Sequence, residues 1–232
     1  MALLVVILQA ITLLATVIGS RYGGCDGGMK KVILSLALGT FGLGMAEFGI
    51  MGVLTELAHN VGISIPAAGH MISYYALGVV VGAPIIALFS SRYSLKHILL
   101  FLVALCVIGN AMFTLSSSYL MLAIGRLVSG FPHGAFFGVG AIVLSKIIKP
   151  GKVTAAVAGM VSGMTVANLL GIPLGTYLSQ EFSWRYTFLL IAVFNIAVMP
   201  SVVPVTLKSI SPKKSSRPWI SVNRTKSSSE SP

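Results

Sequence analysis

The sequence predicts an all-α integral membrane protein, a bundle of membrane-spanning helices. Of its 232 residues, 56% are hydrophobic and only 9% are charged, whereas a soluble domain has roughly 25% charged residues. A chain of this size cannot bury so much apolar surface in a soluble core. Its apolar runs approach the roughly 20 residues that a helix needs to cross a bilayer, and they lack the short alternating pattern of a membrane β-barrel.

Three spans are predicted in the first half of the chain, each too long for a core strand. The first, residues 32–54, follows two lysines and ends at a polar segment. The second, residues 69–90, ends at a break that contains arginine and lysine. The third, residues 98–115, ends at three consecutive serines.

Three more spans follow. Residues 119–145 form the fourth, which ends before a lysine-containing break. Residues 154–178 form the fifth and residues 186–203 the sixth, separated by a short polar segment. A seventh apolar run, residues 3–19, is a weaker candidate.

The basic residues indicate how the spans are oriented. Lys and Arg accumulate in the cytoplasmic loops of membrane proteins. With these six spans, fourteen of the sixteen basic residues fall on one side, Arg185 falls on the other, and Arg126 lies inside a span. We therefore expect residues 29–31 and the C-terminal tail to be cytoplasmic. The net charge of +11 then reflects membrane orientation, and we expect no nucleic-acid partner.

Both ends of the chain differ from the middle. Residues 1–28 are an apolar extension followed by a glycine-rich joint, and Met29-Lys30-Lys31 resembles a natural start. The extension is therefore either an upstream mis-start or an extra helix. Residues 204–232 are rich in Ser, Pro and basic residues, a composition that favours disorder, and a shift of reading frame would also explain them. Residues 29–203 would form the helical domain.

Two charged residues lie deep inside the predicted spans, Glu47 in the first and Arg126 in the fourth. Such residues are costly and usually face a cavity or a partner. We expect both at a similar depth, lining one polar cavity, where a change in their separation would bind or release a proton. The alternative is structural: a buried ion pair, or an arginine held by backbone carbonyl groups.

Four other polar residues are candidates for a substrate cavity. His133 lies seven residues after Arg126, on the same helix face, and an imidazole can bind a hydroxyl group or shuttle a proton. Asn110, Asn168 and Tyr74 are also within spans. The alternative for each of the four is helix packing through a local hydrogen bond.

Glycine spacing in the fifth span indicates close helix packing. Gly159 and Gly163 are four residues apart, as are Gly171 and Gly175, and small residues at this spacing let helices approach closely. Pro173 removes one backbone hydrogen bond. The pattern is compatible with a moving interface and equally with static packing.

Features of other protein classes are missing from the sequence. It contains no nucleotide-binding Gly-Lys loop, and its four His and two Cys are scattered at spacings unsuited to zinc. We therefore expect no metal, no cofactor and no enzymatic activity.

Several motifs together resemble the major facilitator superfamily, in its drug and sugar efflux branch. They are GMAEFGIMGVL around Glu47, ISYYALGVVVGAP in the second span, RLVSGFPHG from Arg126, GMTVANLLGIPLGT, and SWRYTF. Arg92 and Lys96 match the basic positions of the family's signature loop, where Ser91 replaces the usual Asp. Gly163, Gly171, Pro173 and Gly175 match its antiporter motif. Residues 29–199 are similar to the first half of an efflux permease of this branch.

The resemblance implies an antiporter of the bacterial inner membrane that exports sugars, arabinose-like ones among them, or other small solutes, driven by the proton gradient. It associates Arg126 with proton coupling or substrate binding, and Glu47 matches the acidic position of the family. The family fold has two six-helix halves, each with inverted three-helix repeats, and this chain matches the N-terminal half. A missing C-terminal half or a second copy would complete the transporter. The alternatives are a truncated fragment that does not transport, and a membrane scaffold or enzyme subunit.

Overall fold

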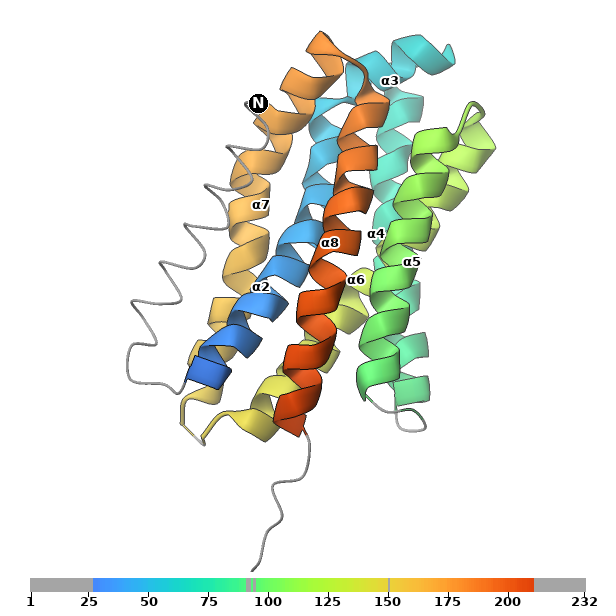
Figure 1. The fold of residues 1–232 in the computed structure, drawn as a ribbon. Coiled ribbons are helices and arrows are strands. Elements are labelled where there is room, and N and C mark those ends of the chain that lie inside the picture. Colours follow the sequence, from blue (N-terminus) through green and yellow to red (C-terminus); the bar gives the residue numbers. More distant parts are fainter. Residues whose placement is uncertain (1–26, 91–92, 94, 150, 211–232) are drawn as a thin grey trace, which may run out of the picture.

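Six long helices dominate the part of the chain that the structure describes. The computed structural model describes residues 27–210 except 91, 92, 94 and 150, so the predicted span 3–19 and the tail beyond residue 210 lie outside it. The long helices run alternately up and down (Figure 1): α2 (Gly27–Phe48), α4 (Ile65–Ser90), α5 (Leu95–Leu115), α6 (Tyr119–Ile147), α7 (Val153–Glu181) and α8 (Trp184–Ile210).

These helices confirm an all-α protein with several membrane spans. Five segments are long and apolar enough to cross a bilayer: Met29–Gly52, Ile65–Leu88, His97–Leu115, Tyr119–Ile147 and Val153–Glu181. In α8 the corresponding stretch, Trp184–Val198, is shorter. The predicted spans and the helices agree in number and order, and their ends differ by a few residues.

The segment after α2 departs from the prediction of a polar break. The chain tightens into a 3-10 turn, η1 (Gly49–Gly52), and then forms a short helix, α3 (Leu54–Val61). Leu57 and Ala58 on α3 are buried, because apolar residues recur there at helical spacing. Gly62 ends α3 in the left-handed region, with φ of 72°, a conformation that glycine adopts at little cost.

Three helix pairs make the most extensive contacts of the bundle: α4 with α6, α2 with α7, and α5 with α6. Helix α5 packs between α6 and α8. Between α4 and α6, a Cβ atom on Gly78 would meet the carbonyl oxygen of Leu127, and one on Gly82 would meet that of Phe131. Glycine is therefore required for these two backbones to touch.

The glycine face of α7 makes the second close contact, against α2 and η1. A Cβ on Gly163 would collide with the backbone of Ala37, and one on Gly175 would lie 2.7 Å from the carbonyl oxygen of Gly49. Gly171 faces Phe48 in the same seam. Pro173 lies on the exposed side of α7, which stays helical through it. The predicted close packing of this span is thus observed.

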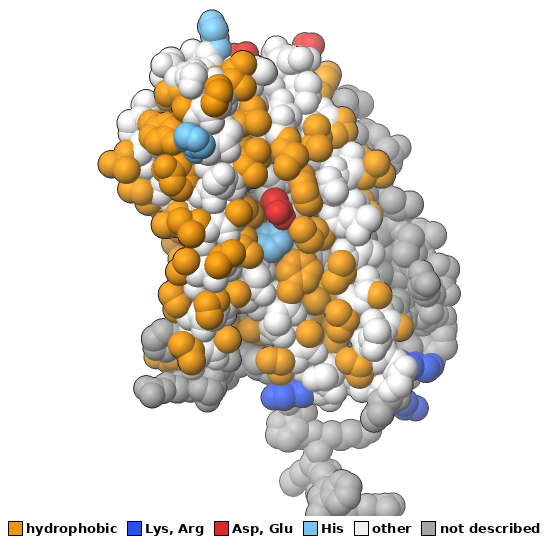
Figure 2. Space-filling view, turned by 180° about the vertical axis from the view of Figure 1, so that it is seen from behind, with side chains coloured by type: hydrophobic (Ala, Val, Ile, Leu, Met, Phe, Trp, Pro, Cys, Tyr) orange, Lys and Arg blue, Asp and Glu red, His pale blue; other side chains and the backbone are white. Residues whose placement is uncertain are grey.

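Apart from Glu47 and Arg126, the described charged side chains gather at the two ends of the bundle (Figure 2). The start of α2, the end of α6 and the start of α7 carry lysines: Lys30, Lys31, Lys146, Lys149 and Lys152. Glu56 on α3 and Glu181 at the end of α7 mark the opposite end. The helices therefore place nearly all described basic residues on one side of the hydrophobic band.

Candidate functional site

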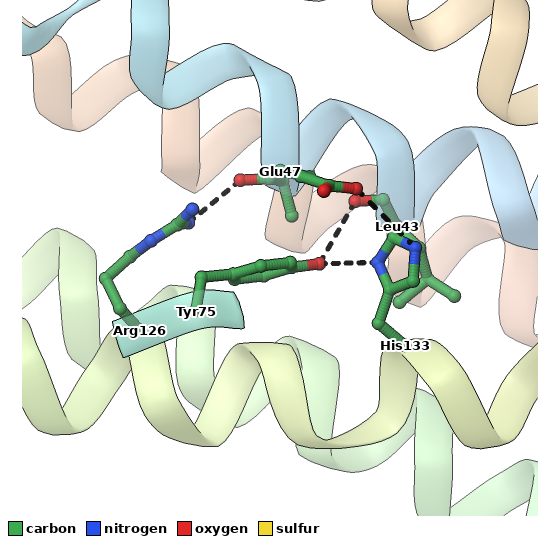
Figure 3. Close-up of polar contacts among 6 residues, drawn as sticks. Leu43, Glu47, Tyr75, Arg126 and His133 are labelled. Carbon is green, nitrogen blue, oxygen red and sulfur yellow. Dashed lines mark hydrogen bonds and ion pairs between the residues drawn. The ribbon is translucent and has the colours of Figure 1, made fainter. Parts of the chain in front are cut away.

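Three helices contribute side chains to one polar cluster, which we define as Glu47, Tyr75, Arg126 and His133 (Figure 3). Glu47 comes from the last turn of α2, Tyr75 from α4, and Arg126 and His133 from α6. The close contact between α4 and α6 brings Tyr75 against α6. The cluster therefore depends on the small residues that allow this contact.

Glu47 pairs with His133. The Oε2 atom of Glu47 lies 3.6 Å from Nε2 of His133, and the two side chains are 31% and 6% exposed. Figure 2 shows an acidic and a histidine side chain together, midway along a mostly hydrophobic face. The Glu47 carboxyl group therefore reaches the surface of this face, while the imidazole behind it is enclosed.

Arg126 is completely buried, and carbonyl groups and aromatic rings surround it. Its Nη1 donates to the carbonyl oxygen of Ala46 at 2.8 Å, and its Nε donates to that of Met71 at 3.4 Å. The guanidinium carbon lies 4.4 Å from the centre of the Tyr75 ring, within the range of a cation–π interaction. Phe113 and Phe188 complete the aromatic enclosure at 5.4 and 5.5 Å.

Glu47 and Arg126 lie near each other without forming an ion pair. Among the described residues, the ion-pair partner of Glu47 is His133, and Arg126 is held by backbone carbonyl groups, the arrangement considered above as the structural alternative. Oε2 of Glu47 and Nη2 of Arg126 are buried and make no hydrogen bond to the described chain. Nη2 of Arg126 is thus a buried donor without a hydrogen-bond partner among the described residues, whereas Oε2 of Glu47 faces the imidazole of His133.

Tyr75 is the member of the cluster that the sequence did not single out. Its hydroxyl group lies 2.8 Å from Nδ1 of His133 and 3.4 Å from the carbonyl oxygen of Leu43. One signal could have found it, since Tyr75 precedes Gly78 by three residues and Gly82 by seven. That spacing places it on the glycine face of α4 that packs on α6.

The other predicted cavity residues lie apart from the polar cluster. Tyr74 contacts the hydroxyl group of Tyr119 at 3.4 Å. Asn110 is buried and donates to the Cys106 carbonyl oxygen of its own helix at 2.8 Å, and Asn168 is exposed on α7. Of the four candidates, the structure brings only His133 beside Glu47.

The signature loop lies partly outside the described residues. Arg92 is not described, and Lys96 belongs to the first turn of α5. In the described part of the chain, no group of three or more His, Cys, Asp or Glu residues could hold a metal ion.

An apolar cavity of about 540 Å³ lies elsewhere, between α4, α5 and α6. Its lining is Ile85, Ile86, Tyr93, His97, Ile98, Phe101 and Phe131. This lining contains no carboxyl group and no member of the polar cluster.

Known proteins resemble this chain over most of its length. The model of the Major Facilitator Superfamily matches residues 36–229. AraJ of Escherichia coli (strain K12), whose name describes a transporter, is 99% identical over 174 residues, which is 75% of this chain and 44% of AraJ. The inner membrane transport protein YdhP of the same organism is 41% identical over 170 residues, 73% of this chain and 44% of YdhP.

The name of a more distant relative refers to a drug. The chloramphenicol resistance protein of Streptomyces lividans is 28% identical over 165 residues, 71% of this chain and 42% of that protein. In each of these comparisons the chain spans less than half the length of the curated relative that it matches.

Proposed function

The chain belongs to the Major Facilitator Superfamily of membrane transporters, and from this membership we propose that it forms the N-terminal half of a proton-coupled exporter of sugars or other small solutes. Membership of this family makes the protein a multi-pass membrane protein, and a transporter rather than an enzyme. The proton as driving ion, the direction of transport and the class of solute are the proposal. We place it in the bacterial inner membrane, where the name of YdhP places that relative.

The observation that carries proton coupling is the Glu47–His133 pair. A carboxyl group within an apolar helix is costly and marks a functional position. The Glu47 side chain is 31% exposed, and its Oε2 lies 3.6 Å from Nε2 of His133. The carboxyl group can therefore exchange a proton with water that reaches this face, and it can pass that proton to the imidazole of His133. Arg126 supplies a fixed positive charge behind the pair.

We propose a sugar as the solute, with a drug-like molecule as the second candidate. The resemblance to the drug and sugar efflux branch supports a sugar of the arabinose type. The name of the Streptomyces relative refers to chloramphenicol, which favours a drug-like solute as the second candidate. The carboxyl group of Glu47 and the imidazole of His133 can form hydrogen bonds with hydroxyl-bearing molecules of either class.

A partner would cover the face on which Glu47 opens. In this family the solute lies between two six-helix halves, so we propose that a C-terminal half or a second copy of this chain provides the opposite wall. Without such a wall the site faces lipid, and the chain would insert into the membrane without transporting.

Solute-driven proton flux in proteoliposomes tests the proposed function. The purified chain is reconstituted with a pH-sensitive dye inside, and pentoses and chloramphenicol are applied as gradients. We expect a flux that Glu47→Gln and Arg126→Ala abolish, while Glu181→Gln, at the exposed end of α7, leaves it unchanged. Absence of flux with every solute would favour the non-transporting fragment, and catalytic turnover would favour a membrane enzyme.

A further inference from the structure

The hydroxyl group of Tyr75 lies within reach of two hydrogen-bond partners. Nδ1 of His133 is 2.8 Å from it, and the carbonyl oxygen of Leu43 is 3.4 Å from it. A hydroxyl group has one proton to donate, and the shorter contact has the better hydrogen-bond length. The geometry therefore favours donation from Tyr75 to Nδ1.

The other side of the imidazole leads to the same assignment. Nε2 of His133 faces the Glu47 carboxyl group at 3.6 Å, and an ionised carboxylate only accepts hydrogen bonds. A neutral imidazole carries its proton on one nitrogen only. If that proton faces Glu47 from Nε2, Nδ1 is an acceptor and needs a donor, which Tyr75 provides.

We propose that Tyr75 is a positioning residue: its hydroxyl group holds the His133 ring with Nδ1 as acceptor and with the Nε2 proton directed at Glu47. Tyr75 is 2% exposed and its ring stands edge-on to the imidazole, at 85° between planes. Without the hydroxyl group, Nδ1 would have no hydrogen-bond donor, and the proton of the neutral imidazole could then lie on either ring nitrogen. The inference rests on the proposed function only for its transport readout.

The same tyrosine connects His133 with Arg126. The guanidinium group covers the face of the ring whose hydroxyl contacts the imidazole. The titratable or charged groups that interact with Tyr75 are Glu47 on α2, Cys106 on α5, and Arg126 and His133 on α6. Tyr75 thus contacts both Arg126 and the imidazole that faces Glu47.

The matched test compares Tyr75→Phe with Tyr74→Phe. Phenylalanine keeps the ring beneath Arg126 and removes only the hydroxyl group. Tyr74 is the adjacent residue on α4, and its hydroxyl group contacts Tyr119 instead of the polar cluster, so its loss controls for removing a tyrosine hydroxyl from this helix.

The direct readout is the ¹⁵N spectrum of histidine-labelled full chain in detergent micelles. The chain has four histidines, and the His133→Gln variant assigns the signals of His133. We expect unprotonated Nδ1 and protonated Nε2 in the unaltered protein and in Tyr74→Phe, and a mixture of tautomers in Tyr75→Phe. A protonated Nδ1 in the unaltered protein, or an unchanged spectrum in Tyr75→Phe, would overturn the proposal.

A transport assay, combined with the spectrum, distinguishes failure of this inference from failure of the proposed function. In proteoliposomes we expect Tyr75→Phe to lower solute-driven proton flux roughly tenfold, the factor given by the loss of one good hydrogen bond, with no change in Tyr74→Phe. The spectrum needs no transport, so a chain without flux but with the expected tautomer contradicts the proposed function alone. If Tyr75→Phe does not fold, the tautomer of the unaltered protein decides.

Discussion

Arg126 shows how a permanent charge is accommodated inside this bundle. Two backbone carbonyl groups accept from its Nε and Nη1, and three aromatic rings surround the guanidinium. The planar group, with donors in fixed directions, suits this enclosure, whereas the ammonium group of lysine is a compact point charge. Charge alone is therefore insufficient at this position.

The Arg126→Lys variant tests the requirement for the guanidinium shape. We expect a lower thermal stability in detergent, because one hydrogen bond to a charged group, worth about 1.5–3 kcal/mol, is lost while the charge stays buried. Lys149→Arg, at an exposed position, is the matched control and should leave the stability unchanged. An Arg126→Lys protein as stable as the original would mean that the carbonyl contacts contribute nothing.

The sequence predicted part of the polar cluster. Glu47, Arg126 and His133 are conspicuous because ionisable residues are rare inside apolar spans. The pairing of Glu47 with His133 was not predictable, since it depends on where α2 ends against α6. Tyr74 and Tyr75 are neighbours in sequence, and only the spacing of Tyr75 to Gly78 and Gly82 indicates which of the two faces α6.

At the scale of the elements, helix contacts depend on glycines whose role can be tested on one helix. Gly82 on α4 meets the Phe131 carbonyl group, whereas a Cβ on Gly69 of the same helix would have nothing within 4 Å. The first position lies in the seam between α4 and α6, and the second lies in open space.

We predict that Gly82→Ala destabilises the protein and that Gly69→Ala does not. Overpacking a tight contact costs typically about 1–3 kcal/mol, whereas alanine in an open helix position gains up to about 1 kcal/mol of helix propensity over glycine. Thermal unfolding of the two variants in the same detergent measures the difference. Equal melting temperatures would show that the α4–α6 contact adapts to the added methyl group.

An arginine also holds the end of α5. Arg185 donates from Nε to the carbonyl oxygen of Thr114 at 3.1 Å and from Nη2 to that of Ser116 at 2.8 Å. These carbonyl groups lie at the helix terminus, where intrahelical partners are lacking. The motif SWRYTF therefore has a structural role in this chain, since it fastens the start of α8 to the end of α5.

Element prediction from sequence succeeded for the long helices and failed for α3. A run of about 20 apolar residues has one structural solution in a membrane, so the spans were predictable. The segment Leu54–Val61 is only eight residues long and carries Glu56, His59 and Asn60 on its polar side, so it resembles a loop until its contacts with the bundle are known.

Basic and acidic side chains lie at opposite ends of the bundle, and this distribution predicts how the protein is oriented in the membrane. The described lysines gather at one end, and Glu56 and Glu181 at the other. Under the positive-inside rule the lysine end is cytoplasmic. The sequence already predicted this side, because span order and basic loops are sufficient for it.

Cysteine labelling in intact cells tests the orientation. In a Cys25→Ser background, with Cys106 buried, we expect a membrane-impermeant maleimide to label Glu181→Cys from outside, and Lys149→Cys only after the cells are opened. Both positions are exposed, so accessibility within the protein is matched. Labelling of Lys149→Cys in intact cells would reverse the topology.

The measurement that tests the central claim most directly is transport by Glu47→Gln in two modes. If Glu47 carries the proton, proteoliposomes with this variant should lose solute transport driven by a pH gradient and keep solute exchange between equal concentrations without a gradient. Glutamine keeps the shape of the side chain and cannot titrate. Gradient-driven transport that persists in Glu47→Gln at the unaltered rate would contradict the account.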